Sequence, residues 1–135
     1  MTAFIDTCIF VALHNADDNL HQRATELMTC ALKGQWGRLF TSDYVIDEAI
    51  TTALMRTKKH NLAQDLANSI IQSPRITKLW ATQEIFNKAI QKFMVLKDHP
   101  LSFTDITSII HIQTAKIQNI LSFDSDFDKL TPRIY

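Results

Sequence analysis

Apolar residues along this chain follow two alternating spacings: short continuous runs, and longer stretches that repeat every three to four residues. Short runs bounded by polar residues are typical of strands, whereas the longer repeat is typical of amphipathic helices. The runs predict strands at Thr2–Ile5, Arg38–Thr41, Arg75–Trp80, Asn119–Phe123 and Arg133–Tyr135. The repeats predict helices at Thr7–His14, Asp17–Lys33, Asp43–Arg56, His60–Gln72, Thr82–Lys97 and Thr104–Lys116. This alternation predicts one α/β domain over residues 1–135.

Particular residues are expected to mark the ends and buried faces of these helices. Gly34 is expected to stop the second helix, and His99-Pro100 to close the fifth. Either Ser102 or Thr104 can cap the last helix. The fifth helix is expected to bury a single apolar stripe, formed by Ile85, Phe86, Ala89, Ile90 and Phe93.

Composition restricts the class of protein. Lys and Arg number 14 and Asp and Glu number 14, so the chain does not have the positive excess of a constitutive nucleic-acid-binding protein. The only two glycines, Gly34 and Gly37, belong to no phosphate-binding loop motif. Cys8 and Cys30 form no C-x-x-C pair and are expected to be small, buried, reduced residues of a cytoplasmic protein. We expect no signal peptide and no membrane span.

Acidic residues stand at the edges of four separate apolar segments. Asp6 ends the first strand, Glu48 lies in a largely apolar helix, Asp105 begins the last helix, and Asp124 and Asp126 follow the fourth strand. In an open parallel sheet, the carboxyl ends of strands meet at one edge, where ligands bind. Several carboxylates in one cleft repel one another unless a cation lies among them, and oxygen ligands favour Mg²⁺ or Mn²⁺. The pattern therefore predicts a divalent-metal site.

Each of these acids also has an ordinary structural interpretation. Asp6 can cap the helix that follows it, Asp105 can stabilise a first helical turn, and Asp124 can belong to a polar loop. Glu48 can be a solvated helix residue. Its neighbour Asp47 lies about 100° further around the helix, so only one of the two can face a given cleft. The four contexts taken together favour a shared site.

These contexts resemble the motifs of the PIN-domain family, and within it the VapC-type toxin ribonucleases of prokaryotic toxin–antitoxin pairs. The first motif is an apolar strand closed by Asp and a hydroxyl residue, and the second is a Ser-led helix that presents one Glu. The third supplies an Asp from a helix N-terminus, and the fourth combines a hydroxyl residue, an acid and a trailing Phe. In this chain the matching segments are Ala3–Thr7, Thr41–Glu48, Leu101–Asp105 and Ile120–Phe127.

The resemblance implies a central parallel sheet flanked by helices on both faces, and metal-dependent endonucleolytic cleavage of RNA. It assigns the metal-binding and catalytic roles to Asp6, Glu48, Asp105 and Asp124. Family members differ in which acid of the fourth motif reaches the metal, so Asp126 is an alternative to Asp124. The resemblance further implies a homodimer silenced by a small VapB-like antitoxin, which is expected to place a basic side chain in the acidic pocket.

The expected chemistry follows from the carboxylates. A bound Mg²⁺ or Mn²⁺ lowers the pKa of a water, orients it toward a phosphodiester and neutralises the leaving oxygen. If two cations bind, Asp6 is the expected bridging ligand. Thr7 and Ser122 can hydrogen-bond the carboxylates or the scissile phosphate, or act as ordinary cap and loop hydroxyls. A basic cluster at one helix end can guide an RNA backbone, although a solvated helix terminus is favoured for its residues, Arg56, Lys58, Lys59 and His60.

Three other functions fit parts of the pattern. A metal-dependent phosphatase of the haloacid dehalogenase type also begins with a strand-end Asp, but needs a second Asp two residues on, where this chain has Cys8. A non-catalytic PIN-like interaction module would lack one of the acids, and none of the four motifs does. A ribonuclease that uses histidine would leave a 2′,3′-cyclic phosphate. The 5 histidines show no ligand spacing such as H-x-x-x-H.

Overall fold

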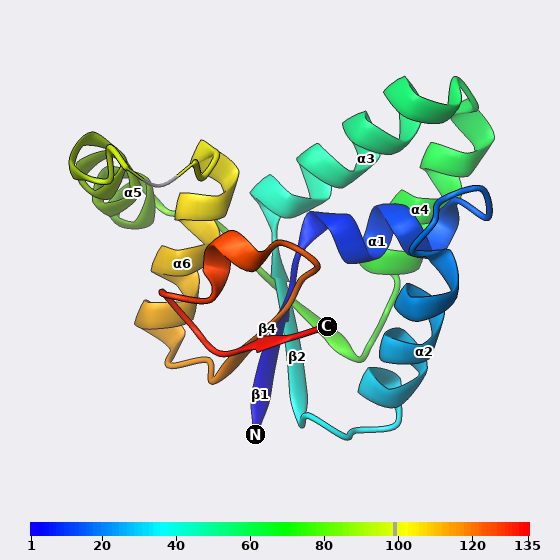
Figure 1. Ribbon diagram of the computed structural model, residues 1–135, viewed down its shortest axis with the longest axis horizontal. Coiled ribbons are helices and arrows are strands. Elements are labelled where there is room, and N and C mark those ends of the chain that lie inside the picture. Colours follow the sequence, from blue (N-terminus) through cyan, green and yellow to red (C-terminus); the bar gives the residue numbers. More distant parts are fainter. Residues whose placement is uncertain (99) are drawn as a thin grey trace.

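Five parallel strands form the central sheet of the computed structural model, which describes residues 1–98 and 100–135 (Figure 1). They are β1 (Thr2–Ile5), β2 (Arg38–Ser42), β3 (Ile76–Leu79), β4 (Asn119–Leu121) and β5 (Arg133–Ile134), in the order β3-β2-β1-β4-β5. The chain winds outward from β1 through β2 to β3, then crosses to β4 and β5 on the other side. Ligands of open parallel sheets bind where the winding reverses, at the carboxyl ends of the strands. Here that point lies between β1 and β4.

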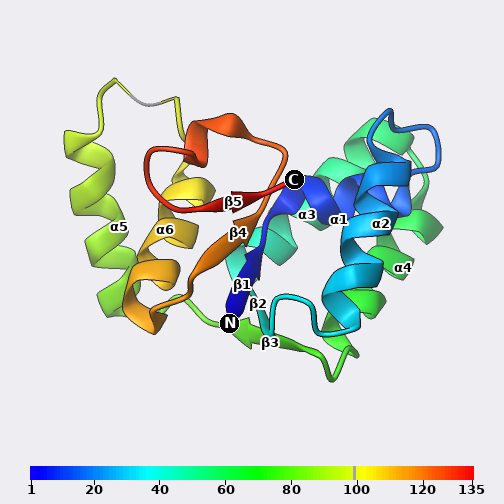
Figure 2. The same ribbon diagram turned by 60° about the horizontal axis from the view of Figure 1, so that its bottom comes forward.

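Helices cover both faces of the sheet, as predicted (Figures 1 and 2). One layer contains α1 (Thr7–His14), α2 (His21–Leu32), α3 (Asp43–Thr57) and α4 (His60–Ile71), which pack against one another. The other layer contains α5 (Gln83–Val95) and α6 (Phe103–Ala115), and a short 3₁₀ turn, η1 (Ser125–Phe127), joins β4 to β5. None of the helices in the described ranges is both long and apolar enough to cross a lipid bilayer.

The core lies on both sides of β1. Phe4 of β1 and Ile120 of β4 are direct neighbours in the sheet register, and both are fully buried. Phe10 of α1, Ile109 of α6 and Phe127 of η1 are buried as well. A parallel sheet buried on both faces has strands that are apolar along their length. Polar side chains therefore gather where the strands end, which is where the sequence has its acids.

The observed helix ends follow local capping groups. Gly34 has a φ of +92°, and α2 ends just before it at Leu32, as predicted. The same helix begins at His21 rather than at Asp17. The preceding turn is closed by a hydrogen bond from the Leu20 N–H to Asp18 Oδ1 at 2.8 Å, which holds this segment out of the helix.

Two further predictions concern the segment between α5 and α6. Ser102 caps α6, with its Oγ accepting a hydrogen bond from the Asp105 N–H at 3.1 Å, so Thr104 lies inside the helix instead of capping it. The prediction that His99 helps to close α5 falls outside the described residues; α5 itself ends at Val95.

The buried stripe predicted for α5 is wrong in part. Ile85 and Ala89 are buried, but Phe86 is 39% exposed and Phe93 is 46% exposed. Their rings pack edge-on against Phe103 of α6, with ring centroids 5.6 and 6.1 Å away. Because α5 packs mainly against α6, the outer part of its apolar stripe remains in solvent.

Candidate functional site

A cleft of about 340 Å³ opens at the carboxyl edge of the sheet, bounded by the ends of β1 and β4, by α1 and α3, and by the start of α6. Four of the five predicted acids line this cleft, namely Asp6, Glu48, Asp105 and Asp124. Asp126 lines a neighbouring hollow together with Asp98 and Asp128. The fold therefore brings together one acid from each of the four sequence motifs.

Asp6 is the most deeply buried of these acids, with 4% of its surface exposed. Its Oδ1 accepts a hydrogen bond from the Thr7 N–H at 2.8 Å, and its Oδ2 accepts one from Ser122 Oγ at 2.7 Å. Burial raises the pKa of Asp6, and the charge of Glu48 adds to the rise, while the hydrogen bonds oppose it. Asp6 thus caps α1 and lines the cleft at the same time, so its structural role leaves the carboxylate at the cleft.

Ser122 connects Asp6 to the acid of the fourth motif. It is fully buried, and while its Oγ donates to Asp6 it also accepts a hydrogen bond from the Asp124 N–H at 3.0 Å. Asp124 in turn accepts the Asp126 N–H through Oδ1 at 2.9 Å, which fixes the turn at η1. One chain of hydrogen bonds therefore sets the positions of the acids that follow β1 and β4.

Cys8 also belongs to this network, which the sequence did not indicate. Its Sγ lies 3.5 Å from both Asp6 Oδ2 and Ser122 Oγ, and it accepts the Phe123 N–H at 3.3 Å. Burial, together with the Asp6 charge, raises the pKa of Cys8 to about 12, so the thiol is protonated at neutral pH. Cys8 and Cys30 are free thiols. Both are half-buried, so the prediction that they are buried is wrong. Cys8 follows Asp6 by two residues in the sequence, and that spacing could have indicated that it lies near the site.

Asp105 caps its own helix while it faces the cleft. Its Oδ2 accepts the Ser102 N–H at 3.0 Å, which completes a capping box with Ser102. Burial raises the pKa of Asp105 to about 6, and the negative charges of Asp6 and Glu48 add to the rise. These carboxylates therefore oppose one another's ionisation, and a cation placed among them relieves that repulsion.

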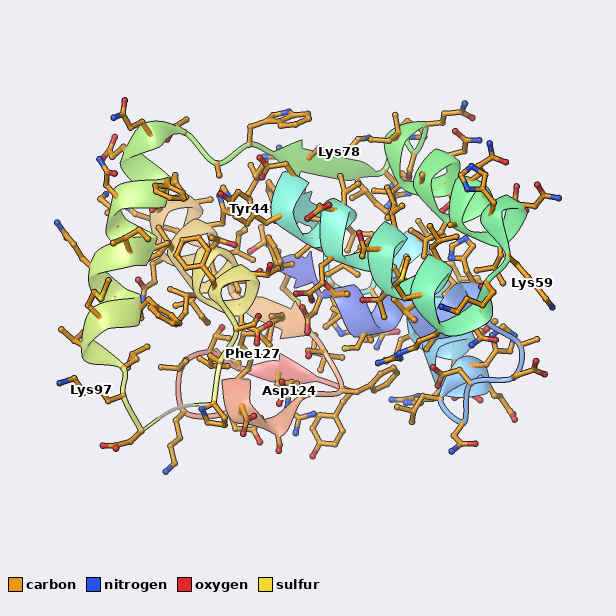
Figure 3. The ribbon with its side chains drawn as sticks, turned by 90° about the horizontal axis from the view of Figure 1, so that it is seen from above. Tyr44, Lys59, Lys78, Lys97, Asp124 and Phe127 are labelled. Carbon is orange, nitrogen blue, oxygen red and sulfur yellow. The ribbon has the colours of Figure 1, made fainter. Side chains whose placement is uncertain are left out.

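One face of α3 forms a wall of the cleft. Glu48 is half-buried and lines the cleft, whereas Asp47 is exposed and does not line it. Of the basic cluster at the end of this helix, Arg56 lines the cleft and Lys59 lines an adjacent hollow that Arg56 also borders. Figure 3 shows α3 running from Tyr44 to the turn at Lys59.

The donor set fits a hard divalent cation. The four acids offer only carboxylate oxygens, which Mg²⁺ and Mn²⁺ prefer. Within residues 1–98 and 100–135, no three acidic, histidine or cysteine side chains stand close enough to enclose an ion as they are. Mg²⁺ usually keeps several waters and binds only one or two carboxylates directly, so the acids need not all touch it.

Comparison with known proteins adds a family and several relatives. The PIN domain profile matches residues 3–131. A VapC ribonuclease of Archaeoglobus fulgidus is 29% identical over 128 residues, which cover 94% of this chain and 80% of that protein. The structure of Mycobacterium tuberculosis VapC20, described as a sarcin–ricin loop cleaving toxin, has a TM-score of 0.84 and 28% identity, covering 94% of this chain and 93% of its own. VapBC2 of Rickettsia felis, bound to a promoter DNA fragment, shares the fold with a TM-score of 0.69 and 14% identity over 99% and 98% of the two chains.

Proposed function

The chain belongs to the PIN domain family, and from this premise we propose that it is a divalent-metal-dependent endoribonuclease, the toxin of a type II toxin–antitoxin pair. The observation that carries the proposal is the convergence of four carboxylates, from four separate elements, on one cleft at the carboxyl edge of the sheet. The similarity to a VapC ribonuclease and to VapC20 supports RNA as the substrate.

In this proposal the cation is Mg²⁺ or Mn²⁺, held by Asp6, Glu48, Asp105 and Asp124, and Asp126 remains the alternative of the fourth motif. When bound, such a cation would polarise the phosphodiester and lower the pKa of a water. Two features of the protein support the assignment: the donors are all carboxylate oxygens, and the pKa values of Asp6 and Asp105 are raised partly by their acidic neighbours.

The protein's own part in the reaction is to hold these groups in place. Both oxygens of Asp6 are fixed, one by the Thr7 N–H and one by Ser122 Oγ, so the carboxylate keeps a single orientation. Groups held in advance of the reaction need not reorganise in the transition state. Thr7 Oγ1 is buried and has no hydrogen-bond partner within the described residues. Thr7 also lines the cleft, and we infer that its hydroxyl turns toward the opening and donates to a phosphate oxygen of the substrate.

The other chemistries considered find less support. In the position where a haloacid dehalogenase phosphatase needs a second Asp, this chain has the protonated Cys8. None of the described residues that line the cleft is a histidine, which disfavours a ribonuclease that uses histidine as acid and base. All four acids are present in the cleft, which disfavours an interaction module that has lost its activity.

The proposal includes a small VapB-like antitoxin and a homodimeric toxin. The acidic cleft supports a partner that inserts a basic side chain, because charge pairing is strong where water is excluded. The likeness to the VapBC2 fold is consistent with such an assembly. A pull-down from native extract that returns only the homo-oligomer would count against the antitoxin.

Adjacent acids on α3 provide the test of the function. Glu48→Gln is expected to lower Mn²⁺-dependent cleavage of a labelled RNA by at least about a hundredfold, because it removes a charge that binds the cation. Asp47→Asn, which removes the same charge from the exposed side of the helix, is expected to cleave like the wild type. A sarcin–ricin loop hairpin and an unstructured RNA serve as substrates. Equal activity of the two variants would overturn the proposal.

A further inference from the structure

The acidic cleft has one basic side chain in its lining, Arg56, among the residues that the structure describes. Other arginines pair with carboxylates: Arg23 lies 3.2 Å from Glu26, and Arg133 lies 2.6 Å from Asp128. Within residues 1–98 and 100–135, Arg56 takes part in none of the ion pairs or side-chain hydrogen bonds. Arg56 is thus an exposed side chain that lines a cleft of carboxylates and is paired with none of them.

Asp18 is the acid that shares Arg56's end of the cleft, and it has a different role. Its Oδ1 accepts the Leu20 N–H at 2.8 Å, in the turn that precedes α2. Val11, Ala12 and Leu20, which also line the cleft, are apolar. Asp17 borders the adjacent hollow together with Arg56, but among the described residues neither Asp17 nor Asp18 forms an ion pair with it.

Arg56 lies on the same face of α3 as Glu48, which belongs to the acidic end of the cleft. Glu48, Thr52 and Arg56 recur at four-residue intervals along α3, and all three line the cleft. Four-residue steps keep them within about 80° of one another around the helix, and the rise from Glu48 to Arg56 is about 12 Å. One helix face therefore presents a carboxylate, a hydroxyl and a guanidinium in sequence. One phosphate group is too small to contact both ends of this row.

The positive charge continues beyond the cleft. Arg56 also borders an adjacent hollow lined by Asn15, Asp17, Thr57, Lys59 and Leu62, so Lys59 adds a second cation there beside one acid. Figure 3 shows that Lys59 lies at the far end of α3 from Tyr44. A chain of phosphates that leaves the acidic end along α3 thus meets two cationic side chains in succession.

We propose that Arg56 binds a backbone phosphate of the RNA next to the scissile one, so that the strand runs along α3 from the carboxylates, past Thr52, toward Lys59. This inference rests on the proposed ribonuclease function. The acidic end of the cleft repels a polyanion, and a guanidinium compensates because it binds phosphate with two parallel hydrogen bonds. Thr52 is a hydroxyl donor for the linkage between the two phosphates. Arg56 is a substrate-binding residue in this account and has no role in the chemical step.

The test measures RNA binding separately from cleavage. Fluorescence anisotropy with a labelled single-stranded RNA, over a salt series in chelator and again in Ca²⁺, compares the wild type with Arg56→Ala, Arg56→Lys and Arg75→Ala. Arg75 is an exposed arginine in a hollow at the start of β3, and its loss changes the net charge equally. Arg56→Ala is expected to raise the Kd about tenfold and to lower the salt slope by about 0.7. Arg56→Lys is expected to keep part of the affinity, and Arg75→Ala all of it.

Steady-state cleavage in Mn²⁺ then distinguishes failure of the Arg56–phosphate contact from failure of the proposed ribonuclease function. Arg56→Ala is expected to raise KM with kcat unchanged, because the contact is the same in the ground and transition states. If the wild type cleaves RNA but Arg56→Ala matches Arg75→Ala in Kd, salt slope and KM, the phosphate contact is wrong and the ribonuclease function stands. If Arg56→Ala alone weakens binding but the wild type cleaves nothing, the function is wrong and the contact stands. A wild type that neither binds nor cleaves RNA overturns both.

Discussion

Three acids that line the cleft each accept a hydrogen bond from a nearby backbone N–H. Asp6 accepts the Thr7 N–H at 2.8 Å, Asp105 accepts the Ser102 N–H at 3.0 Å, and Asp124 accepts the Asp126 N–H at 2.9 Å. Each contact fixes one carboxylate oxygen through a local turn, so the direction of the side chain is set by the nearby backbone. Burial raises the pKa values of Asp6 and Asp105, and the charges of the neighbouring acids add to the rise.

Asp105 leads to a prediction about pH. Its pKa in the folded protein is raised to about 6 from an ordinary value of 3.8, so the folded state binds its proton more tightly than the unfolded state. The Asp105 contribution to the free energy of unfolding is therefore largest below about pH 4 and is lost as the pH rises through about 6. Urea denaturation of the metal-free protein at pH values from 4 to 7 measures this loss. Asp105→Asn is expected to flatten the dependence, and an equal slope in both proteins would contradict it.

Among the elements, the turn between β4 and β5 decides where the fourth acid lies. Arg133 of β5 donates from Nη1 to the Ser122 carbonyl at 3.2 Å and from Nε to Asp128 at 2.6 Å, and its guanidinium lies 3.8 Å from the ring centre of Tyr135. The edge strand thereby holds both ends of the segment that carries Asp124. Since Ser122 also contacts Asp6, this turn and the end of β1 form one hydrogen-bonded unit.

The two acids of this turn give a second prediction. Asp124 lines the cleft, whereas Asp126 lines the neighbouring hollow, so Asp124→Asn is expected to lose more Mn²⁺ affinity than Asp126→Asn, by about tenfold or more. Isothermal titration of both variants with Mn²⁺ measures the difference. Should only Asp126→Asn weaken binding, Asp124 is not the ligand.

The order and type of the elements could be predicted because each has one dominant apolar spacing. Strand-end acids were found for the same reason: where a buried run ends, the next polar residue lies at the edge of the sheet. The exposure of Phe86 and Phe93 depends on which elements pack against α5. The spacing of apolar residues along α5 does not specify those elements. Likewise, the contact of Cys8 with Ser122 exists only because β1 and β4 are neighbours. Pairings between distant segments are what the sequence alone left open.

Over the whole molecule, charge is balanced in number but separated in space. The chain is formally neutral, yet five acids line the cleft at the carboxyl edge of the sheet, and Arg38 and Arg75 line a hollow where β2 and β3 begin. An RNA strand approaching the cleft meets net negative charge unless a cation is bound. Metal binding and RNA binding are thus expected to favour one another, and a basic antitoxin side chain would compete with both.

The central claim is that this cleft hydrolyses RNA through a divalent cation, and the ends of the products test it most directly. RNA cleaved in Mn²⁺ is predicted to carry a 5′-phosphate on the downstream fragment, because the attacking group is a water and not the 2′-hydroxyl of the substrate. Asp6→Asn, prepared identically, controls for contaminating nucleases and is predicted to yield no product. Mass spectrometry of the fragments gives the answer. A 2′,3′-cyclic phosphate, formed by the wild type and absent with Asp6→Asn, would contradict the account.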